Sequence, residues 1–119
     1  MKKMLFIISQ PPYANTHNAE LLDAAMVGAV FDGEVSILFR DDGVWGLLPN
    51  QHGDLIEQKT FSKILSALPT YEVERLFACA PSVADRDLSI SHSPEIELLT
   101  LKQQIALIAA QDVVIGAQR

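Results

Sequence analysis

Short apolar runs alternate along the chain with segments whose apolar residues recur at helical spacing. A continuous apolar run is typical of a strand buried on both faces of a sheet, whereas recurrence every three or four residues indicates a helix with one buried side. Predicted strands cover residues 4–9, 34–39, 73–79, 96–99 and 112–115. Predicted helices cover residues 18–30, 60–68 and 100–110, with a shorter helix or turn at 82–88.

Two of these helices carry more detailed predictions. In the segment 82–88, Ser82 is a plausible N-cap, with Asp85 three residues later in a spacing close to that of a capping box. In the segment 100–110, the predicted helix has one apolar face, which contains Leu101, Ile105, Ile108 and Ala109.

The alternation of strands and helices predicts an α/β domain. Parallel strands need crossover connections, and helices in those connections cover both faces of the sheet. We expect one domain over residues 1–119, with three layers and a mainly parallel sheet of about five strands in the flavodoxin-like order. The loops 10–17, 40–54 and 80–95 should then meet at the carboxyl edge of the sheet, where such folds place their sites.

The charge and the hydropathy of the chain limit the classes of partner that we expect. The formal charge is −6, from 15 acidic and 9 basic residues, which argues against direct binding of nucleic acid. Hydrophobic residues make up 49% of the chain, and the mean hydropathy is +0.18. This excess indicates either apolar surface covered by another subunit or a sheet buried on both faces.

No segment predicts a membrane span, because no apolar run approaches the roughly 20 residues required. The apolar opening of the chain stops at Pro11 and is too short for a signal peptide. A single cysteine also excludes an internal disulfide. We therefore expect a cytoplasmic protein.

Cofactor and metal motifs are missing from the sequence, and we expect neither a cofactor nor a metal. No glycine-rich phosphate loop follows the first strand. The segment 15–18 could offer donors to a phosphate at a helix N-terminus, but it also fits a simple helix cap. The three histidines, His17, His52 and His92, lack the short spacing of a zinc site and fit solvated loops.

Cys79 is the one candidate nucleophile. It ends the predicted strand 73–79, and a carrier thiol there would require help to ionise from a helix N-terminus, from Arg86 or from a loop histidine. The alternative is a small core residue, since free cysteine is among the most buried residue types. No second cysteine is available to resolve a persulfide, so any sulfur on Cys79 must pass to another protein.

The apolar loop 44–49 is the second candidate, and it follows the turn Asp41-Asp42-Gly43. Such a loop either folds back over the sheet or docks on a partner, and tryptophan is enriched at interface hot spots. The residues that we expect at an interface with another chain are Asp41, Asp42, Val44, Trp45, Leu47 and Leu48.

Several segments together resemble a known family. They are the opening Phe6-Ile7-Ile8-Ser9-Gln10-Pro11-Pro12-Tyr13, then Glu20-Leu21-Leu22-Asp23-Ala24, Leu38-Phe39-Arg40-Asp41-Asp42-Gly43-Val44 with Leu47-Leu48-Pro49, Tyr71-Glu72-Val73-Glu74, and Cys79-Ala80-Pro81-Ser82-Val83 with Arg86-Asp87-Leu88. They recur in order over nearly the whole chain, and in this they resemble the TusC/DsrF-like subunits of bacterial sulfur-relay complexes.

The resemblance implies a small flavodoxin-like α/β fold and assembly with related TusB-like and TusD-like subunits, as a heterohexamer. It also implies passage of persulfide sulfur between carrier proteins toward 2-thiolation of the wobble uridine of tRNA, or dissimilatory sulfur oxidation. The carrier cysteine of such complexes belongs to the TusD-like subunit. The resemblance therefore favours a non-catalytic docking subunit of a sulfurtransferase complex, with a persulfide carrier on Cys79 or a flavodoxin-like small-molecule domain as alternatives.

Overall fold

The computed structural model describes residues 2–9, 24–29, 33–47, 73, 75–87 and 96–116, and for residues 45–47 it describes only the backbone. Residues 24–29 are helical. The remaining elements, in chain order, are β1 (Lys2–Ile8), β2 (Gly33–Phe39), the 3-10 helix η1 (Asp41–Leu47), β3 (Arg75–Cys79), α3 (Ala80–Asp85), β4 (Glu97–Leu99), α4 (Leu101–Ala109) and β5 (Val113–Ile115).

The strands form one five-stranded sheet in the order β4-β3-β2-β1-β5, and every pairing is parallel. The expected α/β class with a parallel sheet of about five strands is thus confirmed. The strand order is a correction, because in the flavodoxin order of 2-1-3-4-5 the second strand lies beyond the first. Here β5 takes that place beside β1.

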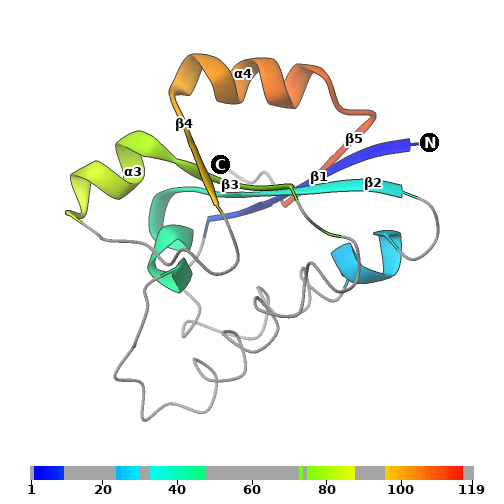
Figure 1. Ribbon diagram of the computed structural model, residues 1–119, viewed down its shortest axis with the longest axis horizontal. Coiled ribbons are helices and arrows are strands. Elements are labelled where there is room, and N and C mark those ends of the chain that lie inside the picture. The colour runs from blue at the N-terminus through cyan, green and yellow to red at the C-terminus, as the bar shows by residue number, and fades with distance from the viewer. Residues whose placement is uncertain are drawn as a thin grey trace, which may run out of the picture.

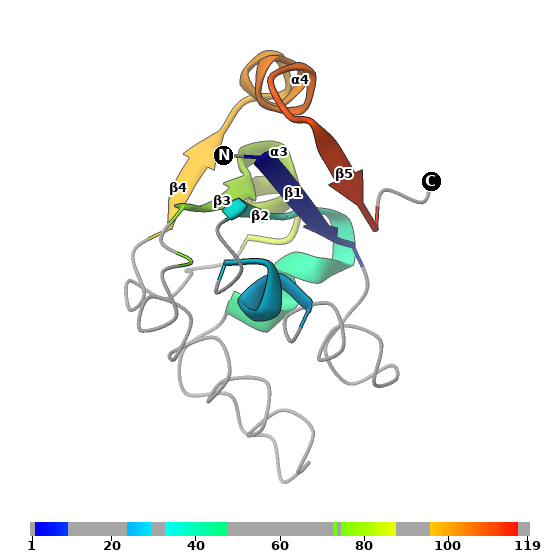
Figure 2. The ribbon, with the colours of Figure 1, turned by 90° about the vertical axis from the view of Figure 1, so that its right-hand side faces the viewer.

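This order explains which helices cover which face of the sheet. From β1 to β4, each strand is added to the sheet on the same side of the one before it. Right-handed crossovers that all run in this direction place their helices on the same face of the sheet. The connection from β4 to β5 runs back across the sheet, so the same handedness places α4 on the opposite face. Figure 1 shows α4 above the sheet and both η1 and the helical residues 24–29 below it, and Figure 2 shows α4 end-on.

The core accordingly has two sides. On the face opposite α4, the largest cluster of buried side chains joins β1, β2 and β3 to the helical residues 24–29, η1 and α3; it includes Phe6, Ile8, Ala25, Ala29, Ile37, Phe39, Val44, Val73 and Val83. Under α4, a smaller cluster contains Leu5, Ile7, Leu38, Phe77 and Leu99, with Leu107 and Ile108 of the helix packed on it. The continuous apolar runs in the sequence reflect this burial on both faces.

Helix α4 begins at a capping box. The Thr100 hydroxyl accepts a hydrogen bond from the backbone N–H of Gln103 (3.2 Å), and the Gln103 side chain accepts one from the backbone N–H of Thr100 (2.8 Å). The face turned to the sheet contains Gln104, which is buried and donates a hydrogen bond to the carbonyl of Leu99 (3.1 Å). The start of the predicted helix 100–110 is therefore correct to within one residue.

The orientation of α4 differs from the apolar face predicted for it. Leu101 and Ile105 are 59% and 70% exposed, whereas Ile108 packs against the core. Leu98 on the edge strand β4 is also 48% exposed. The face that packs therefore includes Gln104, whose amide is satisfied by the Leu99 carbonyl, in place of Leu101 and Ile105.

Several expected features lie outside the described residues. They are the helix at 60–68, the loop 10–17 with its segment 15–18, residue 48, and all three histidines. Among the helices that are described, none is long and apolar enough to cross a membrane.

Candidate functional site

The carboxyl edge of the sheet is where β2 and β3 end, and each strand leads directly into a helix. β2 passes through Arg40 into η1, and β3 passes from Cys79 into α3. Because the two strands are parallel neighbours, η1 and α3 start side by side and contact each other. The expected meeting of the loops that follow these two strands is thus confirmed for their described parts.

The start of η1 is held closely against the end of β1. The backbone N–H of Arg40 donates to the carbonyl of Ile8 (3.0 Å), and the N–H of Gly43 donates to the carbonyl of Arg40 (2.9 Å). A Cβ atom on Gly43 would lie 2.1 Å from the Ile8 carbonyl oxygen, so this approach requires glycine. Asp41 has a positive φ of 52°, a conformation that aspartate tolerates better than most residues.

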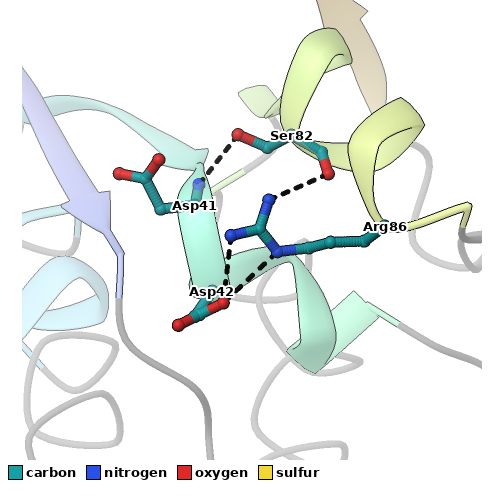
Figure 3. Close-up of polar contacts among 4 residues, drawn as sticks. All are labelled: Asp41, Asp42, Ser82 and Arg86. Carbon is teal, nitrogen blue, oxygen red and sulfur yellow. Dashed lines mark hydrogen bonds and ion pairs between the residues drawn. The ribbon is translucent and has the colours of Figure 1, made fainter.

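Four residues then join η1 to α3, and we call them the η1–α3 clamp: Asp41, Asp42, Ser82 and Arg86 (Figure 3). The backbone N–H of Asp41 donates to the Ser82 hydroxyl (2.9 Å). The Asp42 carboxylate accepts from Arg86 Nη2 (3.0 Å) and Nε (3.3 Å), and Arg86 Nη1 donates to the Ser82 carbonyl (3.2 Å).

The clamp corrects the predicted role of Ser82. Helix α3 starts at Ala80 with Cys79 as its N-cap residue, and no side chain caps it. Ser82 lies inside the helix, and its hydroxyl serves the neighbouring η1 instead. The helix also ends at Asp85, earlier than the predicted 82–88 segment.

Cys79 is buried, with 4% of its surface exposed. It pairs in register with Leu99 of β4, and the alternation of side chains along β3 places it on the same sheet face as Phe77, under α4. The Arg86 guanidinium, a possible neighbour for the thiol from the sequence, instead binds Asp42 and the Ser82 carbonyl.

The residues expected at an interface divide into separate groups. Asp41 and Asp42 are exposed. Val44 is fully buried in the core, so its expected contact with another chain is wrong: the 3-10 turn after Gly43 directs it inward. Trp45 and Leu47 lie on η1 with only their backbone described, and Leu48 lies outside the described residues.

Metal ligands do not gather in the described part of the chain, where no group of three or more His, Cys, Asp or Glu side chains could hold an ion. The described carboxylates that follow β2, those of Asp41 and Asp42, are exposed, and Asp42 is paired with Arg86. The sequence alone could not have identified the clamp, because nothing in the spacing of Asp42 and Arg86 links them until β2 and β3 become neighbours.

Comparisons with known proteins agree with this fold. The family model described as DsrE/DsrF-like matches residues 2–116. A solved structure, the ychN protein from E. coli, superposes with a TM-score of 0.77 over 97% of this chain and 98% of that chain, at 18% identity. At that identity the likeness concerns the fold alone.

Curated relatives span most of the chain. The protein TusC homolog of Pseudomonas aeruginosa is 40% identical over 90 residues, which are 75% of this chain and 76% of the relative. The intracellular sulfur oxidation protein DsrF of Allochromatium vinosum is 34% identical over 96 residues, 81% of this chain and 71% of the relative. Protein TusC of Escherichia fergusonii is 29% identical over 102 residues, 86% of each chain. On this match and these relatives, the chain is a member of the DsrE/DsrF-like family.

Proposed function

We propose that this chain is a docking subunit of a cytoplasmic sulfur-relay complex that passes persulfide sulfur between carrier proteins toward 2-thiolation of the wobble uridine of tRNA. Membership of the DsrE/DsrF-like family and the TusC names of its relatives support the sulfur-relay role. One observation supports the docking role over the carrier role, which is the burial of Cys79 at 4% exposure.

A carrier thiol must reach another protein. In persulfide transfer the thiolate attacks the outer sulfur of the donor persulfide, and the donor cysteine leaves as a thiolate. That displacement needs an accessible sulfur aligned with the donor. Cys79 is only 4% exposed, so a donor sulfur reaches it only after local opening of the fold.

The accessibility of Cys79 gives a direct prediction. We expect the native chain to react with a disulfide reagent on the order of 100-fold more slowly than the urea-unfolded chain, because reaction must wait for opening. Absorbance of the released thiolate measures both rates. We also expect no addition of about 32 Da to the Cys79 peptide after incubation with a persulfide donor; an adduct, or a native rate close to the unfolded rate, would contradict the docking role.

The proposed partners are related TusB-like and TusD-like subunits in a hetero-oligomer, with a heterohexamer as the expected assembly. The surface that we propose for this contact is η1 and the residues that follow it. Asp41 and Asp42 are exposed there, and Trp45, Leu47 and Leu48 add the apolar side chains that interface centres favour.

Replacement of Trp45 tests this surface. We expect Trp45→Ala to weaken association with the sister subunits at least about 30-fold, the factor for an interface hot spot, while the fold remains intact by circular dichroism. Val27→Ala serves as the matched control, because Val27 is an exposed apolar residue on the helical residues 24–29. Calorimetry or co-purification measures the association. If the wild-type chain does not associate with the sister subunits at all, the proposed function itself is contradicted.

Dissimilatory sulfur oxidation is the second candidate, favoured by the similarity to the sulfur oxidation protein DsrF of Allochromatium vinosum. Both functions use the same proposed subunit and differ only in where the sulfur goes. Nucleoside analysis of tRNA from a strain lacking this chain separates them: loss of 2-thiouridine supports thiolation, and an unchanged content supports sulfur oxidation.

A further inference from the structure

Each of the three guanidinium nitrogens of Arg86 donates one hydrogen bond within the clamp. Nε and Nη2 both donate to Oδ1 of Asp42, at 3.3 and 3.0 Å, and Nη1 donates to the carbonyl of Ser82 at 3.2 Å. Its side chain is 24% exposed, against 55% for Asp42. Arginine is thus fixed on its own helix by one bond and reaches across to η1 with the other two.

Element η1 depends on such outside contacts for its position. It begins at Asp41 with a positive φ, and it is anchored to the core at Gly43, which lies against Ile8, and at Val44. The N–H of Asp41 is satisfied by the Ser82 hydroxyl on α3. Ser82 therefore contributes to both halves of the clamp, through its hydroxyl toward Asp41 and through its carbonyl toward Arg86.

We propose that Arg86 is a positioning residue that fixes η1 against α3 and so presents the backbone of η1 to a partner in one preset position. The presentation of η1 to a partner rests on the proposed function, whereas the fixing of η1 against α3 does not. Preorganisation of a loop favours binding because less conformational freedom is lost on association. Arg86 then changes affinity by holding η1 in place, without being part of the proposed contact surface itself.

Backbone amide exchange measured by NMR on the isolated chain tests the fixing of η1. The reporters are the amides of Asp41, which donates to Ser82, and Gly43, which donates to Arg40. We expect Arg86→Gln and Asp42→Asn each to speed exchange at these amides about fivefold, the factor that corresponds to the upper range for a surface ion pair. The double variant should exchange no faster than Arg86→Gln, since that change already removes the contact with Asp42 together with the bond to the Ser82 carbonyl.

Glu34→Gln is the matched control. It removes the other described ion pair, Arg75–Glu34 at 2.7 Å, which joins the starts of β2 and β3 at the opposite edge of the sheet. We expect exchange in η1 to stay unchanged in this variant. Unchanged exchange in Arg86→Gln, or equal acceleration in Glu34→Gln, overturns the positioning role of Arg86.

Association with the sister subunits then tests the consequence for binding. We expect Arg86→Gln to weaken the affinity for the sister subunits by a similar factor of about five. Unchanged affinity despite faster exchange would overturn the proposal that Arg86 presents η1 to the partner. The two proposals fail in different ways. If the wild-type chain does not associate at all, the proposed function fails, while the exchange measurement on the isolated chain still decides whether Arg86 fixes η1.

Discussion

Gly43→Ala is expected to destabilise the protein by about 3 kcal/mol, because a methyl group there has no room. The added Cβ would lie 2.1 Å from the carbonyl oxygen and 2.7 Å from the carbonyl carbon of Ile8. Both are backbone atoms in a strand at the centre of the core, so neither can rotate away as a side chain could. Either η1 must lift from β1 or the end of β1 must move. Urea unfolding followed by circular dichroism measures the loss as a lower midpoint at unchanged slope.

Gly28→Ala provides the control for this prediction. A Cβ on Gly28 would lie 3.5 Å from Met4 Sδ and from a methyl carbon of Val35, which are ordinary contacts. Alanine is also the better helix former by about 1 kcal/mol, so this variant should be neutral or slightly more stable. A Gly43→Ala protein as stable as Gly28→Ala would show that the approach of η1 to Ile8 is not required by the fold.

Val44→Asp is the second large effect that we expect, at about 3–5 kcal/mol of lost stability. Val44 is fully buried among the side chains that join η1 to the sheet. A carboxylate at this position would be desolvated, and its neighbours are apolar side chains that cannot neutralise its charge. Thermal and urea unfolding of the isolated chain measure the loss directly, with no partner present.

This substitution separates a core role for Val44 from an interface role. An interface residue could accept a charge in the isolated chain and would lose only its assembly with partners, whereas a core residue loses stability before any partner is added. Val27→Asp is the matched control, because Val27 is 56% exposed and the same change there should cost within about 0.5 kcal/mol. An isolated Val44→Asp chain with wild-type stability would contradict the burial of this side chain.

The clamp and Val44 together change how the segment after β2 should be understood. From the sequence, the apolar residues from Val44 onward look like one continuous docking loop. In the structure, Gly43 and Val44 anchor η1 inward, while Asp41 and Asp42 remain exposed beside α3. A surface held from both sides in this way is suited to a rigid contact with a partner, which is the behaviour that the exchange and association measurements examine.

The sequence by itself determined the fold class and most strand positions. Runs such as Phe6-Ile7-Ile8 and Leu76-Phe77-Ala78 can be buried only in a sheet covered on both faces, and the observed sheet is covered on both. The start of α4 was also predicted to within one residue, because the capping box that begins it is a local interaction between Thr100 and Gln103. Local patterns of this kind need no knowledge of distant neighbours.

Only the tertiary structure decided the strand order, the roles of Ser82 and Arg86, and the orientations of Val44 and α4. An alternating pattern of strands and helices fits both the flavodoxin order and the observed one, since both are parallel sheets covered by helices on both faces. Ser82 became a partner of Asp41, and Arg86 of Asp42, only when β2 and β3 were placed side by side. Likewise, only the packing of α4 on the sheet shows that Gln104 faces inward and Ile105 is exposed. Each of these features depends on which segments become neighbours, and contacts between distant parts of the chain leave little mark on local sequence periodicity.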